Sequence, residues 1–410
     1  MTKLAHSIDE YASVTGQQVI DELRLLADKA KGKKIQNVNS TAVGGGVAEI
    51  LNRMVPLFQE LGVDATWDVI KGGDKFYKVT KKFHNALHGG KEEIGPEDFE
   101  AFLDTSELNN RTLPLTGDVE FIHDPQPIAL IDQKNSRNAK WIWRCHIDVS
   151  KPDPRVWNFL KPFIERYDAA IFSAPAFSQE LKIRQFLISP SIDPLSDKNR
   201  ELPPETIQEV LDRFKLDPEK PMVTQISRFD YLKDPLGVIA AFEQVQRNMD
   251  CQLILAGGEA TDDPESTEVL TKVRERAAAN PDIHVLAIPS GSDIEINALQ
   301  RASAVVVQKS LKEGFGLTVT EALWKGKPVV AGAVGGITLQ ISHKYSGLLC
   351  HSVEGAAHAI KQLLQNPDYA KKLGENGREH VRHNFLLTRH LKEYLLLCLA
   401  LFHEGDIVPL

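Results

Sequence analysis

The feature that most constrains the fold of this 410-residue chain is a regular alternation of short β-rich runs with helical segments in its second half. Segments of helical composition, such as 236–247 and 265–280, separate most of these runs. The β-rich runs themselves lie at 222–227, 251–257, 283–288, 304–308, 328–332 and 346–350. This alternation is typical of a parallel sheet that is flanked by helices.

The first half repeats the pattern less regularly. Its candidate strands lie at 34–38, 65–70, 119–123, 141–146, 169–173 and 185–189. A turn-rich stretch with several prolines, 189–205, follows them and resembles a linker. The sequence therefore predicts an α/β protein with two doubly wound domains, and the cleft between the domains is the expected ligand site.

Residues 1–32 precede the first expected strand. They predict an added amphipathic helix that packs on the first domain or contacts a second subunit. The apolar residues that lie partly on one face of this helix are Val19, Ile20, Leu23, Leu25 and Leu26.

Composition excludes several classes of protein. The chain has 48 basic and 56 acidic residues, so it lacks the basic surface of a typical nucleic-acid-binding protein. Its longest strongly apolar run near the end, 394–402, is far shorter than the ~20 residues that span a bilayer. No basic region followed by an apolar stretch begins the chain, so we expect a cytoplasmic location. Four dispersed cysteines are expected to be small core residues, without disulfide bonds or a zinc site: Cys145, Cys251, Cys350 and Cys398.

A glycine-rich loop runs into a helix at E-G-F-G-L-T-V-T-E, residues 313–321. The N-terminus of a helix presents unpaired N–H groups and a partial positive charge, which favour a phosphate. Glu313 precedes the loop and Glu321 lies about one turn inside the helix, so the two carboxylates bracket a bound group. Carboxylates accept hydrogen bonds from vicinal hydroxyls, as on a sugar or a ribose. The alternative for Glu321 alone is a solvated acid in the first turn.

Two cations follow the first strand of the second half, in the run S-R-F-D-Y-L-K-D-P. Arg228 and Lys233 lie at the carboxyl end of that strand, where open α/β sheets bind ligands. Together they can neutralise a diphosphate without a metal. The acidic metal clamp D-x-D does not occur in the chain, which favours a metal-independent site. The alternative is that both cations are surface charges paired with Asp230 and Asp234.

The first half offers polar groups of two kinds. A run of three glycines, residues 44–46, lies between a strand and a helix and suggests close approach to a ligand, although a bare turn would need the same residues. Its pattern lacks the last glycine of a dinucleotide fingerprint. Polar side chains also end two strands and could bind sugar hydroxyls, while a lone histidine there is often structural. They are His123, Asp124 and Gln126 after one strand, and His146 and Asp148 after the next.

Taken together, these motifs resemble retaining glycosyltransferases of the GT-B fold, family four. I-H-D-P-Q at 122–126, W-R-C-H-I-D at 143–148, Q-I-S-R-F-D at 225–230 and E-A-L-W-K-G-K-P-V-V-A at 321–331 resemble a narrower trehalose-forming group. That group contains the glycosyltransferring trehalose synthases and the trehalose phosphorylases. The resemblance covers nearly all of the chain after residue 35. It implies two Rossmann-like domains facing a central cleft: 1–205 on the acceptor side, 206–384 binding the nucleotide sugar, and a last helix within 385–410 that returns to the first domain.

The resemblance also implies roles for residues. Arg228 and Lys233 would hold the donor diphosphate, Glu321 the ribose, and Glu313 the donor glucose, while His146 would contact that glucose near its 6-hydroxyl. The expected catalytic residues are Arg228, Lys233, Glu313 and His146. The expected nucleotide- and phosphate-binding residues are Gly45, Gly46, Arg228, Lys233, Gly316, Leu317, Thr318 and Glu321. The expected sugar-binding residues are His146, Asp148, Asp124, Gln126, Glu313, Gly314 and Phe315.

The implied reaction is transfer of glucose from a nucleoside diphosphate glucose to free glucose, which gives α,α-trehalose with retention. We expect no cofactor and no metal, small-molecule partners only (the nucleoside diphosphate glucose, glucose and trehalose), no nucleic acid or membrane, and a homodimer as one assembly. Three alternatives stay open at this point. They are a trehalose phosphorylase that uses phosphate and glucose 1-phosphate, a catalytically silent nucleotide-sugar sensor and, more weakly, a nicotinamide oxidoreductase.

Overall fold

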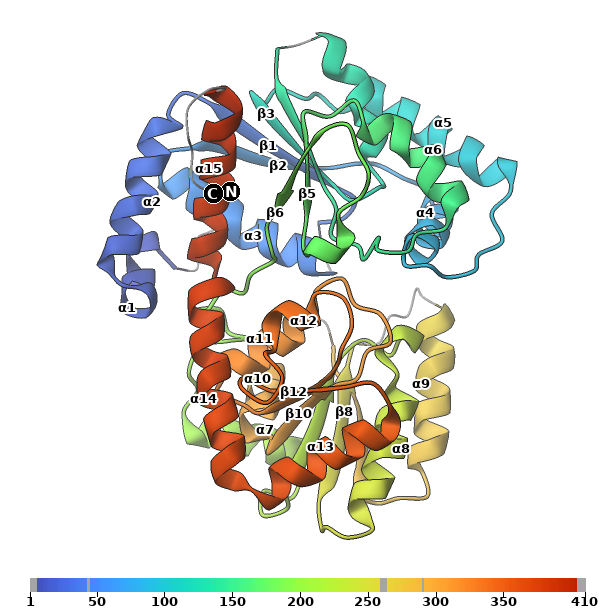
Figure 1. Cartoon of the computed structure of the whole chain (residues 1–410), viewed down its shortest axis with the longest axis vertical. Coiled ribbons are helices and arrows are strands. Elements are labelled where there is room, and N and C mark those ends of the chain that lie inside the picture. Colours follow the sequence, from blue (N-terminus) through green and yellow to red (C-terminus); the bar gives the residue numbers. More distant parts are fainter. Residues whose placement is uncertain (1–5, 43–44, 137, 259–263, 290, 404–410) are drawn as a thin grey trace. The chain divides into compact units, whose positions relative to one another are not determined.

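The chain divides into two compact units, each built around its own sheet. The computed structural model describes residues 6–42, 45–136, 138–258, 264–289 and 291–403. Unit 1 comprises Met1–Ser191 and Leu387–Leu410, and unit 2 comprises Ile192–Leu386. Each unit holds one six-stranded sheet whose neighbouring strands pair in parallel (Figure 1). The predicted α/β class with two parallel sheets is confirmed.

The sheet of unit 1 has the strand order β2-β1-β3-β4-β5-β6. Its strands are β1 Lys34–Asn39, β2 Asp64–Val69, β3 Val119–His123, β4 Lys140–Arg144, β5 Ala169–Phe172 and β6 Arg184–Leu187. The register pairs His123 with Arg144, the last residues of β3 and β4. Because the strands are parallel, the loops after β3 and β4 emerge at the same edge of the sheet.

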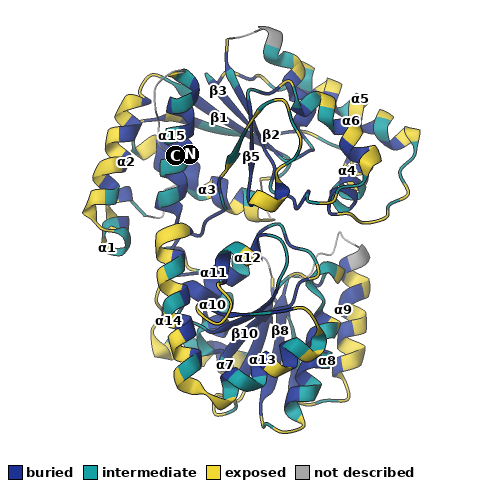
Figure 2. Ribbon diagram, in the orientation of Figure 1, coloured by how far each residue is buried: buried dark blue, intermediate teal, exposed yellow. Residues whose placement is uncertain are grey.

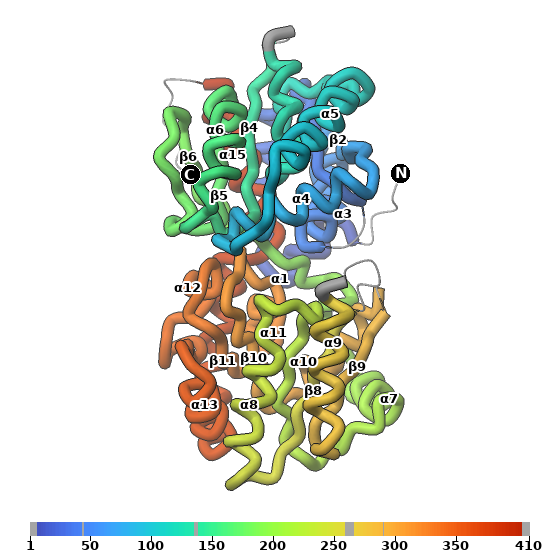
Figure 3. The backbone as a smooth tube through the Cα atoms, turned by 90° about the vertical axis from the view of Figure 1, so that its right-hand side faces the viewer, coloured from blue at the N-terminus to red at the C-terminus, as the bar shows by residue number. Residues whose placement is uncertain are grey.

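Helices cover both faces of this sheet. Figure 1 shows α2 (Gln17–Lys29), α3 (Gly45–Glu60) and α15 (Leu387–Phe402) on one side. On the other side lie α4 (Asp74–Leu87), α5 (Pro96–Thr112) and α6 (Pro154–Ile164), and α4 and α5 lie in front in Figure 3. Tyr394 of α15 stacks on Phe121 of β3, with 4.7 Å between the ring centroids. The short elements are η1 Ile8–Tyr11, α1 Ala12–Thr15, η2 Ile128–Ser136 and η3 Pro175–Phe177.

The N-terminal extension forms η1, α1 and α2, and α2 packs against α15 within unit 1. Ile20, Leu23 and Leu26 are buried, as expected for the apolar face of this helix. Leu25 is not part of that face, because its side chain is 59% exposed. The buried stripe repeats at helical spacing, and position 25 falls on the opposite side of the turn.

The sheet of unit 2 has the order β12-β11-β10-β7-β8-β9. Its strands are β7 Met222–Ile226, β8 Gln252–Gly257, β9 Ile283–Ala287, β10 Val305–Gln308, β11 Val329–Gly332 and β12 Leu348–Cys350. Leu253 and Leu255 of β8 face one apolar cluster, while Ile254 and Ala256 face another. Both faces of the sheet are therefore buried, and Figure 2 shows its strands in the colour of buried residues.

One face of this second sheet is covered by α8 (Pro235–Gln246), α9 (Pro264–Ala277) and α13 (Val353–Gln365). The other face is covered by α7 (Pro204–Phe214) and α10 (Asp293–Ala302). The remaining helices are η4 Tyr231–Lys233, α11 Leu317–Trp324, α12 Ile337–Gln340 and α14 Pro367–Asn384.

The chain enters and leaves unit 2 at neighbouring points. The N–H of Ile192 donates to the carbonyl of Phe385 at 2.9 Å. Residues 192–205, which the sequence predicts in the first domain, belong to unit 2. They are tied there by Asn199, whose side-chain oxygen accepts a hydrogen bond from Lys325. The last helix, α15, belongs to unit 1.

The four cysteines are free and buried, as the sequence analysis expects for small core residues. Among the residues that the structure describes, no helix has the length and apolar character needed to cross a membrane.

Helix α14 approaches the backbone that follows α11 unusually closely. A Cβ atom at Gly374 would lie 1.9 Å from the carbonyl oxygen of Gly326. Gly374 therefore allows α14 to pack closely against the C-terminal end of α11, the helix that begins at the glycine-rich loop.

Replacing Gly374 by Ala tests this packing. In an open helix the change stabilises the protein by ~1 kcal/mol. Here we expect a loss of about 2 kcal/mol or more, because the backbone must move to relieve the overlap. Urea unfolding measures it, with Glu375→Ala, at an exposed position of the same helix, as the control. An unchanged or raised midpoint for Gly374→Ala would contradict the close approach.

Candidate active site

Unit 2 brings Lys233 and Glu313 into direct contact. Lys233 ends η4 after β7, and Glu313 lies in the loop between β10 and α11. The two strands are neighbours in the sheet, and the N–H of Leu311 donates to the carbonyl of Leu232 at 2.8 Å, which joins the loops. Lys233 Nζ lies 2.6 Å from Glu313 Oε2, and both side chains are largely buried. The predicted cation and carboxylate are therefore one ion pair.

The second oxygen of Glu313 is available. Ser310 Oγ also donates to Glu313 Oε2, at 3.2 Å. Oε1 has no hydrogen-bond partner among the described residues, so it can accept one from a ligand. Gly316 lies against this side chain, because a Cβ at Gly316 would be 3.1 Å from Glu313 Cγ.

Arg228 takes a different position from Lys233. Its side chain is 57% exposed and lies 3.0 Å from Asp230 Oδ2. The carboxylate of Asp230 also caps η4 by accepting from the N–H of Leu232 at 2.7 Å. Asp234, in contrast, pairs with Lys309 and caps α8. The alternative of surface ion pairs thus describes Arg228 and Asp230, but not Lys233.

The E-G-F-G loop is fixed from behind. Gly316 precedes α11 in the left-handed region, at φ +84°, which glycine adopts without strain. Gln340 donates to the carbonyl of Phe315 at 2.5 Å and accepts from Thr320 at 2.6 Å. A Cβ at Gly336 would lie 2.6 Å from the carbonyl oxygen of Gly314. The first amides of α11, at Leu317 and Thr318, are therefore held at a helix N-terminus that suits an anion.

Glu321 is a buried carboxylate, with 4% of the residue exposed, so it is not a solvated first-turn acid. Gln300 Nε2 lies 3.4 Å from Glu321 Oε2. Lys325, one turn further along the chain, donates to the carbonyl of Glu321 at 3.3 Å and to Asn199 Oδ1 at 3.1 Å. Burial lowers the pKa of Lys325 to about 7, although the charge of Glu321 acts in the opposite direction.

In unit 1, Asp124 shapes the loops after β3 and β4. It has a positive φ of 66°, and its Oδ1 accepts from the N–H of His146 at 2.7 Å. Burial raises the pKa of Asp124 to about 6, against the opposing effects of this hydrogen bond and of Arg144. Strand β4 ends at Arg144, so His146 and Asp148 lie in the loop and not in the strand. Asp148 is buried and accepts from the N–H of Ser150 at 3.0 Å.

His146 is connected to His123, which the sequence suggested only as a polar strand end, and through it to Asn37, which the sequence did not suggest. His146 Nε2 lies 3.1 Å from His123 Nδ1, and His123 Nε2 lies 3.1 Å from Asn37 Oδ1. Arg144 is fully buried beside them. The available signal was a polar residue in the middle or at the end of a buried strand: Asn37 in β1, His123 in β3 and Arg144 in β4.

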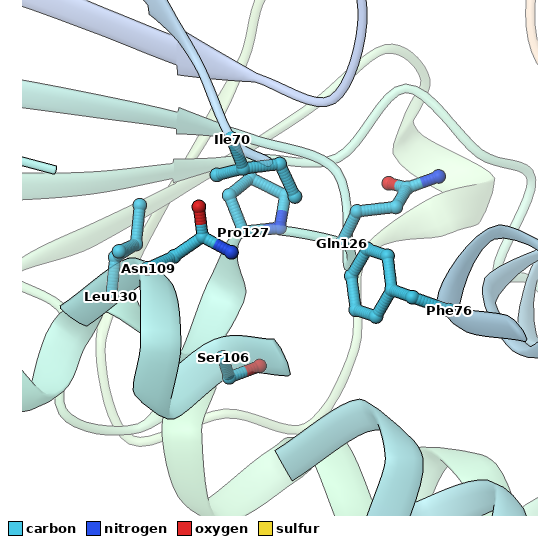
Figure 4. Close-up of a pocket in the computed structure, with 7 residues that line it drawn as sticks. All are labelled: Ile70, Phe76, Ser106, Asn109, Gln126, Pro127 and Leu130. Carbon is cyan, nitrogen blue, oxygen red and sulfur yellow. The ribbon is translucent and has the colours of Figure 1, made fainter. Parts of the chain in front are cut away.

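Gln126 and the glycines complete the predicted groups of unit 1. Gln126 lines a narrow hollow, and its buried Oε1 has no hydrogen-bond partner among the described residues. Figure 4 shows this hollow with its other lining residues, Ile70, Phe76, Ser106, Asn109, Pro127 and Leu130. Gly45 opens α3 at φ +78° with open space around it, and Gly46 follows. Gly44 lies outside the described residues.

The predicted site residues therefore fall into two sets. Unit 1 carries Gly45, Gly46, Asp124, Gln126, His146 and Asp148, and unit 2 carries Arg228, Lys233, Glu313, Gly314, Phe315, Gly316, Leu317, Thr318 and Glu321. Within the described part of the chain, no three His, Cys, Asp or Glu side chains are grouped so that they could hold a metal ion.

Comparison with known proteins gives two family matches. Residues 37–179 match the family described as "Trehalose synthase, N-terminal domain", and residues 207–380 match "Glycosyl transferases group 1". A trehalose synthase from Pyrococcus horikoshii is 43% identical over 95% of this chain and 95% of its own. A trehalose phosphorylase from Grifola frondosa is 30% identical over 92% of this chain but 59% of its own.

The fold is also found among solved structures. A sucrose-phosphate synthase from Thermosynechococcus elongatus has a TM-score of 0.72 and 19% identity, and the match covers 90% of this chain and 99% of that one. At this identity the similarity concerns the fold alone. It supports the GT-B architecture that the sequence resemblance implies.

The lowered pKa of Lys325 makes stability depend on pH in a defined direction. Between pH 7 and the ordinary lysine range, the unfolded chain binds a proton that the folded chain does not, so stability rises with pH. We expect the free energy of unfolding of the wild type to rise relative to Lys325→Met by up to roughly 1.4 kcal/mol for each pH unit between 7 and 9.

Urea unfolding of both proteins across this pH range measures the difference. Lys372→Met, at an exposed position of α14, is the control and should run parallel to the wild type. A pH-independent difference between the wild type and Lys325→Met would show that Lys325 keeps an ordinary pKa.

Proposed function

This chain belongs to the trehalose synthase family of group 1 glycosyltransferases, and we propose that it moves glucose from a nucleoside diphosphate glucose to free glucose. The product would be α,α-trehalose, formed with retention at the donor carbon. The donor would be UDP-glucose or ADP-glucose. The observation that carries the proposal is the Lys233–Glu313 ion pair, which sets a cation and a carboxylate side by side next to the N-terminus of α11.

The leaving group of such a reaction is a nucleoside diphosphate, whose negative charge increases as the glycosidic bond breaks. Lys233 and Arg228 are the cations on the loop after β7 that would offset this charge. The amides of Gly316, Leu317 and Thr318 would add the positive end of α11. These groups supply the stabilisation without a metal, which agrees with the absence of D-x-D from the sequence.

Arg228 and Lys233 would act at different stages. Lys233 is already held by Glu313, whereas Arg228 is exposed and, among the residues that the structure describes, pairs only with Asp230. An exposed ion pair costs little to break, so Arg228 can turn to the diphosphate when it arrives. Lys233 would keep its contact with Glu313 and bind phosphate with its remaining N–H groups.

The donor glucose would lie against Glu313. Its unpartnered Oε1 would accept from sugar hydroxyls, and its charge would stabilise the positive charge that develops on the ring. Gly314 and Phe315 would line the same sugar, and His146 would contact it near the 6-hydroxyl. Asp148 and Asp124 would shape the loop around His146, and the free amide oxygen of Gln126 would accept from a hydroxyl.

The nucleotide would be recognised by a buried residue of α11. Glu321 would bind the ribose hydroxyls, and Gly45 and Gly46 would approach the phosphates from the first domain. A pair of carboxylates placed for double displacement is not evident among the described residues, so we favour departure and attack on one face of the sugar. In that step the bond from the anomeric carbon to the phosphate oxygen breaks, the acceptor oxygen bonds to that carbon, and the leaving phosphate oxygen takes the acceptor proton.

A trehalose phosphorylase reaction is the second candidate, because relatives with that name match most of this chain. The two reactions differ in the donor. Product formation from glucose should be compared with UDP-glucose, ADP-glucose and glucose 1-phosphate. Trehalose formed from a nucleotide donor, with release of the nucleoside diphosphate, supports the proposal. Trehalose formed only from glucose 1-phosphate would instead support the phosphorylase reaction.

We expect EDTA to leave the activity intact, because the proposed mechanism uses no metal. Complete loss of activity that Mg²⁺ restores would contradict the metal-free mechanism.

Arg228→Ala and Lys233→Ala should each lower turnover strongly. A charge-assisted contact to the leaving group contributes ~2 to 4 kcal/mol in the transition state, or roughly 30- to 1,000-fold in rate. Steady-state rates with the nucleotide donor measure this effect. Arg213→Ala is the matched control, because Arg213 is 58% exposed and forms a single ion pair with Glu295. Near wild-type turnover in both test variants would refute the assignment.

Glu313→Gln separates a catalytic role from a bracing role. The variant keeps the size and a hydrogen-bonding oxygen but loses the charge, so turnover should fall far more than the affinity for UDP. Single-turnover rates beside calorimetric UDP binding measure both quantities. If Glu313 only holds Lys233 and the glycine-rich loop, the variant should instead show weaker UDP binding at an unchanged single-turnover rate.

A further inference from the structure

Three side chains in unit 1 form a chain of hydrogen bonds that starts inside the sheet and ends at the surface. Asn37 lies in β1, His123 ends β3, and His146 follows β4. Asn37 Oδ1 lies 3.1 Å from His123 Nε2, and His123 Nδ1 lies 3.1 Å from His146 Nε2. Asn37 and His123 are buried, whereas His146 is partly exposed. The order of protons along this chain determines what His146 presents to a ligand.

The first bond has a defined direction. Asn37 Nδ2 donates to the carbonyl of Thr66 at 3.4 Å, which turns Oδ1 toward His123. The reverse orientation would place two oxygen atoms together. An amide oxygen only accepts, so His123 Nε2 must carry the proton in this bond.

The second bond follows if His123 is neutral. A protonated imidazole would donate from both nitrogens, whereas a neutral one with its proton on Nε2 accepts at Nδ1. The buried guanidinium of Arg144 opposes further positive charge here: it donates to Ser173 Oγ at 3.3 Å and forms no salt bridge with any described residue. Burial together with Arg144 lowers the pKa of His123 to about 3.

The same surroundings keep His146 neutral. Burial comes first among the causes that hold its pKa well below the ordinary value, followed by Arg144, His123 and His390. The other ionisable groups of this cluster are Asp124, whose Oδ1 accepts the N–H of His146, and Tyr394, which lies beside His390 on α15. The neutral ring of His146 therefore carries one N–H proton, either on Nδ1 or on Nε2.

We propose that Asn37 and His123 are positioning residues that fix His146 as the tautomer with its proton on Nε2, so that Nδ1 is an acceptor for a hydroxyl of the donor sugar. His146 Nδ1 has no hydrogen-bond partner among the described residues, which leaves it available. The tautomer depends on the hydrogen bonds above and on a neutral His123, whereas the sugar contact rests on the proposed function. The direction is specific: the sugar hydroxyl donates, and a group that only accepts is disfavoured.

The tautomer can be observed directly. Long-range ¹H–¹⁵N spectra of the full chain, labelled with ¹⁵N-histidine, distinguish a protonated ring nitrogen from a bare one. The signals of His146 are identified by their loss in His146→Ala. At pH 7 we expect a protonated Nε2 and a bare Nδ1 in the wild type. A protonated Nδ1, or an imidazolium, would overturn the proposal without any measurement of activity.

A matched pair of variants tests the role of His123. His123→Asn can keep an acceptor oxygen near the place of Nδ1, whereas His123→Leu removes it. We expect the wild-type tautomer of His146 in the Asn variant and a mixture of both tautomers in the Leu variant. Asn37→Leu, which frees the Nε2 end of His123, should give the same mixture and serves if His123→Leu does not fold. Wild-type spectra for His146 in both Leu variants would refute the positioning role.

The direction of the sugar contact has its own measurement. In UDP-glucose with fluorine in place of the 6-hydroxyl, the substituent cannot donate a hydrogen bond. We expect the wild type to prefer the hydroxyl by about 10-fold or more in kcat/KM. The preference should persist in His123→Asn, weaken in His123→Leu and disappear in His146→Ala. Equal use of both donors by the wild type would refute the sugar contact, and no turnover of any nucleotide glucose would refute the proposed function, while the spectra still decide the tautomer.

Discussion

The arrangement of unit 2 depends on the ion pair between Lys233 and Glu313, which are 80 residues apart in the chain. Two strands, β8 and β9, separate β7 from β10 in the sequence, yet β7 and β10 are neighbours in the sheet. The parallel topology thus delivers the two loops to one edge, and the ion pair with the Leu311–Leu232 backbone bond fixes their distance. Losing one partner would leave the other charge largely buried, which is far more costly than losing a surface pair.

Loops from neighbouring strands also meet at one edge of the sheet in unit 1. The ends of β3 and β4 emerge side by side, and the loop after them is held by Asp124 with its backbone in the left-handed region. Here a buried cation, Arg144, takes no carboxylate partner from the described part of the chain, and the three imidazoles near it remain uncharged. In unit 2 the largely buried Lys233 is therefore paired with a carboxylate. In unit 1 the imidazoles near the buried Arg144 carry no further positive charge.

Most of the fold could be predicted from the sequence, because each strand is a short β-rich run bounded by helical or turn-forming residues, and such signals are local. The E-G-F-G loop was recognisable for the same reason. The sequence did not predict that Glu321 is buried, that Leu25 is exposed or that Asn199 ties 192–205 to unit 2, since each depends on packing between distant segments. Asn37 was missed, and His123 was noted only as a polar strand end, because their hydrogen bonds join three different strands or strand ends, a relation that no spacing along the chain expresses.

Helix α15 belongs to unit 1 although the whole of unit 2 lies between it and the rest of that unit in the chain. Tyr394 on this helix covers Phe121 in the centre of the first sheet, and His390 bonds to Ser191. A ribosome therefore releases every residue of unit 2 before it releases the helix that completes the core of unit 1. During synthesis one face of the N-terminal sheet therefore lacks the helix α15 until unit 2 has been made. Unit 1 begins to be synthesised first but completes its core last.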